Sequence, residues 1–161
     1  MAVDTTTIVI MGATGDLGQR KLLPTLFELR CNGVCPANLR IVGFARTELT
    51  DEAFREHMWK GVQEFRALAI HKSKWDKFAQ HLYYVPGNLD DETHIAKLKD
   101  RLKALEGAEA GSTNRLFYLS ISPTLFEATL KNMKATGIAT EEDGWSRVVI
   151  EKPFGRNFAS A

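Results

Sequence analysis

Residues 8–18, IVIMGATGDLG, decide the fold class of this chain. They carry a β-branched apolar run, which begins at residue 5, into three glycines and then into a leucine-rich segment. An apolar run of this length that stops at a glycine is typical of a strand buried on both faces, as in a parallel sheet. We therefore predict a strand over residues 5–11 and a helix over residues 17–31, joined by a glycine-rich turn.

The predicted helix over residues 17–31 contains a proline. Its helical character is indicated by Leu22, Leu26 and Leu29, which recur at helical spacing, and Gly33 follows as a stop signal. Pro24 lacks an amide hydrogen, and its ring crowds the preceding turn. We therefore expect the helix to bend at Pro24.

The rest of the chain alternates between short apolar runs and amphipathic stretches. Strands that alternate with helices indicate βαβ units and a parallel sheet. We predict one α/β domain over residues 1–161, Rossmann-like and doubly wound, with a mainly parallel sheet. Further strands are expected over residues 40–45, 82–85, 115–121 and 147–150, further helices over residues 51–68, 93–105 and 123–137, and a surface loop over residues 107–114.

The composition is that of an ordinary globular domain. Of 161 residues, 44% are hydrophobic and 25% charged, and 21 basic against 20 acidic residues give a formal net charge of +1. This balance argues against nucleic acid or an anionic membrane surface as a partner, and no apolar run is long enough to predict a membrane span. Cys31 and Cys35 do not have the spacing of a redox or zinc motif, so we predict free thiols, no metal site and a cytoplasmic location.

The glycines of the turn, Gly12, Gly15 and Gly18, lie where a dinucleotide-binding fold places its phosphate site. In such a fold the first glycine allows a tight turn, and the second lets backbone N–H groups approach a pyrophosphate. The third lets helix and strand pack closely. An ordinary turn that happens to use glycine is the alternative. We expect Asp16 to point away from a bound phosphate or to cap the helix.

Arg46 immediately follows the second predicted strand, where a dinucleotide-binding fold contacts the adenosine ribose. An acid at this position bonds the ribose hydroxyls of NAD. An arginine instead suits the 2′-phosphate of NADP, because the guanidinium matches a phosphate in charge and geometry. Glu48 is the only acid nearby. We therefore predict NADP as the cofactor, with a solvated surface arginine as the alternative.

Residues 151–155, EKPFG, follow the last predicted strand. Ligands of open α/β sheets bind at the carboxyl ends of strands, so Lys152 is placed to reach a cofactor or an anionic substrate. Pro153 is expected to fix the turn, with a cis peptide bond as one possibility. An ion pair between Glu151 and Lys152 is the alternative to a functional role.

Several other motifs are absent from the sequence. No Gly-Lys-Ser/Thr follows the glycines, so a P-loop is excluded. No lysine stands four residues after any tyrosine, as the active site of short-chain dehydrogenases requires. The four histidines are scattered, and we predict that none is catalytic. The three tryptophans are isolated and are expected to be packing groups.

Five blocks of the sequence resemble, in order, the N-terminal domain of the glucose-6-phosphate 1-dehydrogenase family. Together they cover essentially the whole chain, and the final EKPFG block makes the resemblance specific. The blocks are IVIMGATGDLGQRKLLPTLFEL (8–29), IVGFAR (41–46), LYYVPGNLDD (82–91), NRLFYLSISPTLFEA (114–128) and RVVIEKPFGRN (147–157). Gly18, Gln19 and Asn157 depart from the residues that are usual in this family.

The resemblance implies oxidation of D-glucose 6-phosphate to 6-phosphogluconolactone with hydride transfer to NADP, the entry step of the pentose phosphate pathway, by a homo-oligomer. It implies Arg46 at the 2′-phosphate, Phe126 near the cofactor, and Lys152 in contact with both the cofactor and the sugar phosphate. The residues that it places under the pyrophosphate and adenosine are Gly12, Ala13, Thr14, Gly15, Asp16 and Leu17.

The resemblance also places the family's substrate and dimerisation domain after the EKPFG strand, with its general-base histidine beyond Ala161, the last residue of this sequence. We therefore expect the chain to end shortly after its dinucleotide-binding domain, to bind NADP and to be inactive alone, because hydride transfer from a sugar hydroxyl needs a positioned base. Two alternatives stay open. One is a non-catalytic NADP-sensing module, and the other is a different two-domain NADP-dependent sugar oxidoreductase.

Overall fold

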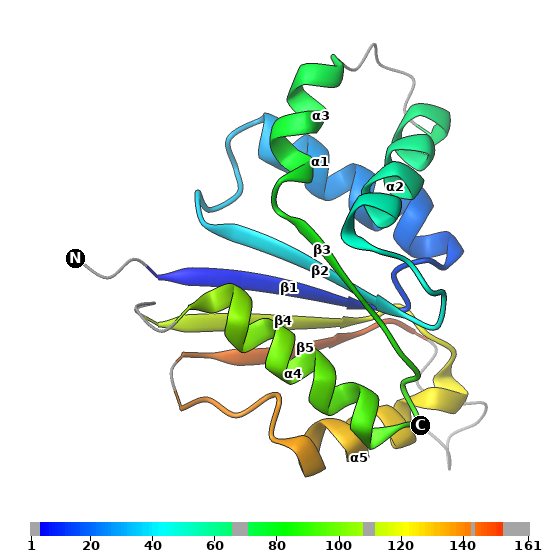
Figure 1. Cartoon of the computed structure of the whole chain (residues 1–161), viewed down its shortest axis with the longest axis vertical. Coiled ribbons are helices and arrows are strands. Elements are labelled where there is room, and N and C mark those ends of the chain that lie inside the picture. Colours follow the sequence, from blue (N-terminus) through cyan, green and yellow to red (C-terminus); the bar gives the residue numbers. More distant parts are fainter. Residues whose placement is uncertain (1–3, 66–70, 108–111, 143, 153–161) are drawn as a thin grey trace.

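The computed structural model describes residues 4–65, 71–107, 112–142 and 144–152. At its centre lies a five-stranded sheet in which every neighbouring pair of strands is parallel (Figure 1). The strands are β1 (Thr5–Met11), β2 (Leu39–Ala45), β3 (Leu82–Pro86), β4 (Thr113–Leu119) and β5 (Ser146–Ile150). Their order is β3-β2-β1-β4-β5, so the direction of winding reverses between β1 and β4. This confirms the predicted Rossmann-like, doubly wound fold.

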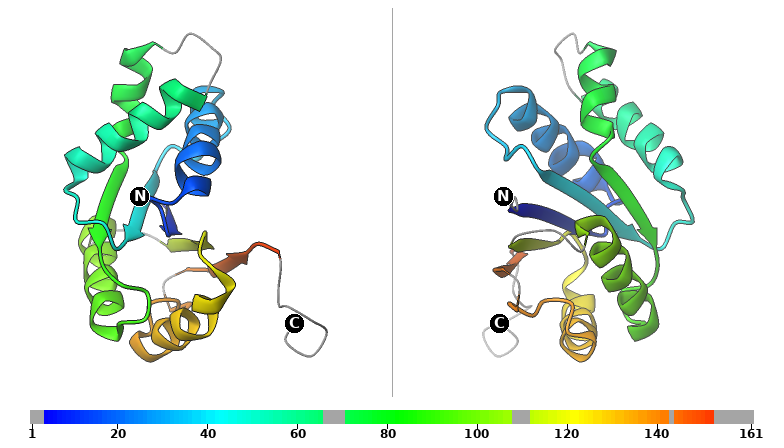
Figure 2. Two further views of the ribbon diagram at one scale, coloured as in Figure 1. Left: turned by 90° about the vertical axis from the view of Figure 1, so that its right-hand side faces the viewer. Right: turned by 60° about the vertical axis from the view of Figure 1, so that its left-hand side comes forward.

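Helices cover both faces of the sheet and give the domain three layers (Figures 1 and 2). They are α1 (Leu23–Cys31), α2 (Asp51–Phe65), α3 (Lys72–Ala79), α4 (Glu92–Glu106) and α5 (Phe126–Thr136), with a π-helical turn η1 (Gly18–Leu22) before α1 and a 3₁₀ turn η2 (Pro123–Leu125) before α5. The first three helices pack on one face, and α4 and α5 pack on the other. No helix within the described ranges is long and apolar enough to cross a membrane.

Alternate residues of β1 enter two separate cores. Ile10 packs with side chains of α1, α2 and α3, whereas Val9 and Met11 pack with side chains of α4 and α5. All three side chains are at most 1% exposed. Continuous apolar runs in the sequence therefore reflect a parallel sheet that is covered on both faces.

The predicted bend at Pro24 takes the form of a π-helical turn. The amide of Leu23 donates to the carbonyl of Gly18, five residues back, at the end of η1. Pro24 directly follows this turn, inside the helical run that begins at Asp16, so the widened π-helical turn accommodates a residue that has no amide hydrogen to donate. The buried face of α1 is formed by Leu23 and Phe27, while Leu29 is 37% exposed.

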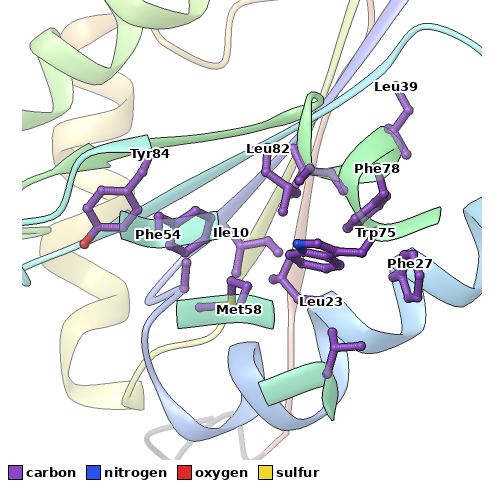
Figure 3. Close-up of a cluster of buried hydrophobic side chains, with 14 of the residues drawn as sticks. Ile10, Leu23, Phe27, Leu39, Phe54, Met58, Trp75, Phe78, Leu82 and Tyr84 are labelled. Carbon is purple, nitrogen blue, oxygen red and sulfur yellow. The ribbon is translucent and has the colours of Figure 1, made fainter. Parts of the chain in front are cut away.

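α3 is a helix that the sequence patterns do not predict, yet it completes the core on its face of the sheet (Figure 3). Trp75 and Phe78 lie edge-on to Phe27, with ring centroids 5.5 and 5.2 Å apart. Trp75 is 2% exposed, which confirms it as a packing group. The buried positions Trp75, Phe78 and Ala79 have helical spacing, but a helix of eight residues is marginal by itself, so α3 depends on this packing for its stability.

The remaining predicted elements are confirmed with shifted ends. Thr50 caps α2 by accepting a hydrogen bond from the amide of Ala53 at 3.2 Å; the predicted end of this helix at residue 68 falls outside the described residues. Asp91 caps α4, and Gly137 ends α5 with a φ of +63°. The prediction for β4 was wrong at both ends, because residues 113–114 pair with β1 and the strand ends at residue 119.

Candidate functional site

Two adjoining clefts open at the carboxyl edge of the sheet, where the direction of winding reverses. Open α/β sheets bind their ligands at this place. The larger cleft has a volume of about 710 Å³ and the smaller about 260 Å³. Both are lined by Gly15 and by residues 120–122. A single elongated ligand can therefore lie across the two clefts.

The glycine-rich turn after β1 approaches its neighbours too closely for side chains. Gly12 has a φ of +84°, and a Cβ there would lie 2.2 Å from the carbonyl oxygen of Ser120. A Cβ on Gly18 would lie 2.3 Å from the carbonyl oxygen of Ala13. The positive φ confirms the tight turn predicted at Gly12, and the close approach at Gly18 confirms the packing role predicted for the third glycine.

Gly15 presents an open backbone to both clefts. It is exposed, and a Cβ there would meet only the carbonyl oxygen of Gly12, at 3.1 Å. Helical structure begins at Asp16, and the first amides of a helix have no partner within it. Together with the helix dipole, these amides suit an anion. The Asp16 carboxylate pairs with Arg20 at 3.3 Å, which offsets a charge that would repel phosphate.

Arg46 lines the larger cleft from the carboxyl end of β2. Its side chain is exposed and makes no hydrogen bond or ion pair with the part of the chain that the structure describes, Glu48 included. The hydroxyl of the next residue, Thr47, lies 3.3 Å from the hydroxyl of Thr14 in the glycine-rich turn. An unpaired guanidinium thus stands beside the glycine-rich turn.

Tyr84 of β3 supports the turn that carries Arg46. Its hydroxyl donates to the carbonyl oxygens of Ala45, at 2.9 Å, and Thr47, at 2.7 Å. Its ring is 4% exposed and stacks on Phe54 at a centroid distance of 4.8 Å. Burial, with a smaller effect of the nearby Glu48 carboxylate, raises the pKa of Tyr84 to about 12. The hydroxyl therefore remains a donor at neutral pH.

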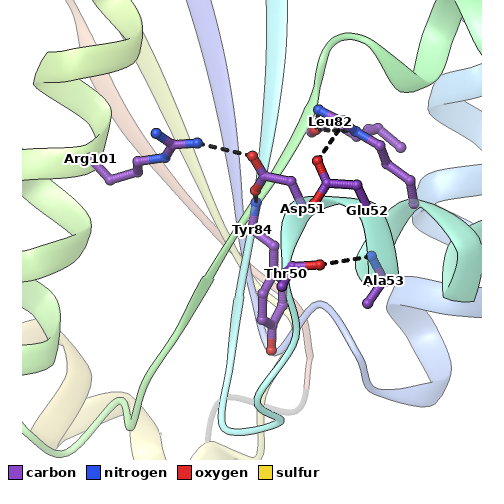
Figure 4. A network of polar contacts seen from close by, with 8 residues as sticks. Thr50, Asp51, Glu52, Ala53, Leu82, Tyr84 and Arg101 are labelled. Atoms are coloured by element: carbon purple, nitrogen blue, oxygen red, sulfur yellow. Dashed lines mark hydrogen bonds and ion pairs between the residues drawn. The ribbon is translucent and has the colours of Figure 1, made fainter.

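Asp51, the first residue of α2, fixes Tyr84 in turn (Figure 4). One carboxylate oxygen of Asp51 accepts the backbone amide of Tyr84 at 2.7 Å. The other accepts a hydrogen bond from Arg101 of α4 at 2.9 Å. These contacts join α2 and α4, which pack on opposite faces of the sheet, to β3, the strand that carries Tyr84.

The smaller cleft brings together the segments that follow β1, β4 and β5. Phe126 at the start of α5 and Lys152 after β5 line it together with Leu17. Lys152 is exposed and has no ion pair within the described ranges. The neighbouring Glu151 accepts a hydrogen bond from the hydroxyl of Tyr118. Burial, followed by this contact with Glu151, raises the pKa of Tyr118 to about 12.

Two of the positions singled out in the sequence follow Lys152 in the chain. Pro153 and Ala161 both fall outside the described residues. The turn expected at Pro153 therefore stays a prediction, and so does a general-base histidine beyond Ala161.

The structure brings most of the predicted site residues to the two clefts. Ala13 differs, because it is fully buried, lines neither cleft and donates its amide to the carbonyl of Phe44 at 3.3 Å. Further lining residues follow the ends of β2, β3 and β4 and were not predicted, although the rule that ligands bind at strand ends points to them. These residues are Thr47, Asn88, Leu89, Asp90, Ser120, Ile121 and Ser122. Across the described residues, no cluster of His, Cys, Asp and Glu could hold a metal ion.

Residues 9–161 match the family described as glucose-6-phosphate dehydrogenase, NAD binding domain. The chain belongs to this family. This confirms the resemblance drawn from the five sequence blocks. By its description, the family is a domain that binds a nicotinamide coenzyme. The open glycine backbone and the unpaired Arg46 fit such an anionic ligand.

Named relatives agree with this family. Glucose-6-phosphate 1-dehydrogenase 2 of Mycobacterium tuberculosis is 37% identical over 155 residues, which are 96% of this chain and 30% of the relative. Glucose-6-phosphate 1-dehydrogenase of Chlamydia pneumoniae is 40% identical over 158 residues, 96% of this chain and 31% of the relative. A structure of glucose-6-phosphate dehydrogenase in complex with its substrate glucose-6-phosphate has a TM-score of 0.84 and 31% identity, covering 99% of this chain and 32% of that one. The chain spans about a third of the length of these relatives.

Proposed function

We propose that this chain binds NADP across the two clefts and is the coenzyme domain of an enzyme that oxidises D-glucose 6-phosphate to 6-phosphogluconolactone. The observation that carries the proposal is the unpaired Arg46 guanidinium in the larger cleft. The open backbone of Gly15 lines the same cleft. The relatives are glucose-6-phosphate dehydrogenases, and one of them was solved with glucose-6-phosphate. These relatives support the substrate.

Each cleft has a separate role in this proposal. In the larger cleft, the amides that follow Gly15 bind the pyrophosphate, and Arg46 binds the 2′-phosphate. In the smaller cleft, Phe126 contacts the nicotinamide half, and Lys152 offers an unpaired ammonium to the coenzyme and to the sugar phosphate. The coenzyme, when bound, accepts the hydride from the sugar. Gly12, Thr14, Asp16 and Leu17 complete the proposed coenzyme contacts. Ala13 is left out of them, because it is fully buried and lines neither cleft.

The proposal extends to the setting of the longer protein. Cys31 and Cys35 are both free thiols, which supports a reducing, cytoplasmic compartment. The resemblance supports a homo-oligomer whose general base follows Ala161 in the chain. A non-catalytic NADP-sensing module would use the same coenzyme site, and the activity of the longer protein distinguishes it from an enzyme.

Titration of the chain with NADPH and NADH, followed by coenzyme fluorescence, tests the proposal. We expect NADPH to bind more tightly, and Arg46→Ala to weaken NADPH binding by about 10- to 100-fold, the value of a charge-assisted contact. NADH binding should change little in the same variant. Arg147→Ala is the matched control, because Arg147 is an exposed arginine that lines neither cleft.

Two results would contradict the assignment of Arg46. One is equal affinity for NADPH and NADH in wild-type protein that melts cooperatively. The other is a preference for NADPH that survives in Arg46→Ala. A companion variant, Lys152→Ala, tests the smaller cleft, and unchanged coenzyme affinity there would remove Lys152 from the coenzyme contacts.

A further inference from the structure

We infer that Tyr84 is a positioning residue that sets coenzyme selectivity by holding Arg46 ready for a 2′-phosphate. The inference rests on the proposed function of Arg46. Tyr84 lines neither cleft, so it acts through Arg46 and not by touching the coenzyme.

The hydrogen bonds of the Tyr84 hydroxyl bracket Arg46 in the chain. The accepting carbonyl oxygens belong to Ala45 and Thr47, the residues on either side, at 2.9 and 2.7 Å. The Ala45 carbonyl also accepts the amide of Gly87 at 2.9 Å. The backbone from which the Arg46 side chain projects is therefore held on both sides.

Tyr84 is itself fixed, so it can hold the turn firmly. Its ring stacks on Phe54 and is almost fully buried. Its amide donates to Asp51, which also binds Arg101 (Figure 4). A phenylalanine would fill the same space in the core, so packing alone does not explain the hydroxyl. The hydrogen bonds that the hydroxyl donates to the backbone beside Arg46 give it a role.

Holding the turn favours the ligand that carries a 2′-phosphate. A bidentate contact between a guanidinium and a phosphate needs a defined direction of approach. Arg46 is exposed and has no protein partner among the described residues to fix its direction. A fixed backbone reduces the ordering cost of the contact. NADH lacks the 2′-phosphate, so its affinity should not depend on this effect.

Titration of Tyr84→Phe with NADPH and NADH tests the inference. We expect the ratio of NADPH to NADH affinity to fall by about three- to tenfold, the value of one buried hydrogen bond. The fall should come from weaker NADPH binding, with NADH binding unchanged. Tyr83→Phe is the matched control, because Tyr83 is the adjacent tyrosine of β3 and its side chain packs on the opposite core.

A double variant separates this inference from the proposed function. In the Arg46→Ala background, Tyr84→Phe should change neither affinity further, since the group that it positions is gone. If Arg46→Ala alone keeps the wild-type ratio, the proposed role of Arg46 fails, and the role of Tyr84 fails with it. If Arg46→Ala lowers the ratio but Tyr84→Phe does not, or lowers both affinities equally, only the positioning role is overturned.

Asp51→Asn provides a second variant if Tyr84→Phe does not fold. The amide oxygen can still accept the Tyr84 backbone amide, but the charge that binds Arg101 is lost. We expect the ratio to fall in the same direction and by less than in Tyr84→Phe. An unchanged ratio in folded Asp51→Asn would overturn the inference.

Discussion

At the scale of single residues, two tyrosine hydroxyls hold groups beside the clefts. Tyr84 donates to the backbone on both sides of Arg46. Tyr118 donates to the Glu151 carboxylate, next to Lys152. Each contact needs a protonated phenol, and burial is the main cause that raises both pKa values to about 12. Both the arginine and the lysine of the proposed site therefore have neighbours that are sensitive to alkaline pH.

This sensitivity predicts a loss of stability in alkali. A raised pKa means that the folded chain keeps a proton that the unfolded chain loses. The stabilisation is complete below pH 10 and is lost as the pH rises through about 12. We expect the Tyr84 contribution to be about 1 kcal/mol, and that of Tyr118 to be smaller because solvent screens its exposed contact with Glu151.

Urea denaturation across this pH window measures the loss, and tyrosinate absorbance identifies the groups that titrate. Tyr84→Phe should be less stable than wild type at neutral pH but should lose less stability on going to alkaline pH. Tyr83→Phe again serves as the control. An equally steep decline in Tyr84→Phe would show that other groups cause the alkaline loss.

At the scale of elements, the turn that leads from β1 through η1 into α1 places the amides that we propose as the pyrophosphate site. Gly18 allows η1 to lie against the Ala13 carbonyl, and the π-helical turn is followed directly by Pro24. The position of the helix that begins at Asp16, relative to the sheet, therefore depends on the absence of a side chain at Gly18.

Gly18→Ala should disrupt this arrangement. The added Cβ would lie 2.3 Å from a backbone oxygen, so the helix must move away from the turn. We expect a loss of about 1–3 kcal/mol in the free energy of unfolding and weaker binding of NADPH and NADH alike. Chemical denaturation and coenzyme titration measure the two effects. Lys21→Ala, an exposed change in η1, is the control, and wild-type behaviour of Gly18→Ala would refute the packing role.

At the scale of the whole molecule, the layers bring the carboxyl ends of all five strands to the two clefts but no histidine. All four histidines lie within the described ranges, and none lines either cleft. His94 uses Nδ1 to accept the amide of Asn88 at 3.1 Å, behind the larger cleft. Oxidation of a sugar hydroxyl needs a base beside it to take the proton, and the resemblance places that base beyond Ala161.

We therefore expect the chain to bind NADP but to form no NADPH when glucose 6-phosphate is added. Absorbance of NADPH measures turnover, and fluorescence titration of the same sample shows that the coenzyme site is intact. Turnover that disappears in Lys152→Ala would contradict the prediction, because it would place a complete catalytic site in these clefts.

How much of the site could be predicted depended on distance along the chain. Gly12, Gly15 and Gly18 were found because their spacing after a strand is a local signal. Arg46 was singled out because it directly follows an apolar run, and Lys152 because it stands two residues after one. Tyr84 was missed, since its hydroxyl meets a carbonyl 39 residues away in the chain. α3 was missed for a similar reason, as its packing partner Phe27 lies in a different helix.

The sequence by itself determined the α/β class, the five strands and the glycine-rich turn, because apolar runs, caps and glycines act over a few neighbouring residues. Only the tertiary structure decided the strand order and the partners of each strand end. That order places the segments after β2 and β4 on either side of the turn after β1, and it places Tyr84 beneath Arg46. Strand register and side-chain packing join residues far apart in the chain, and no local pattern encodes which of them meet.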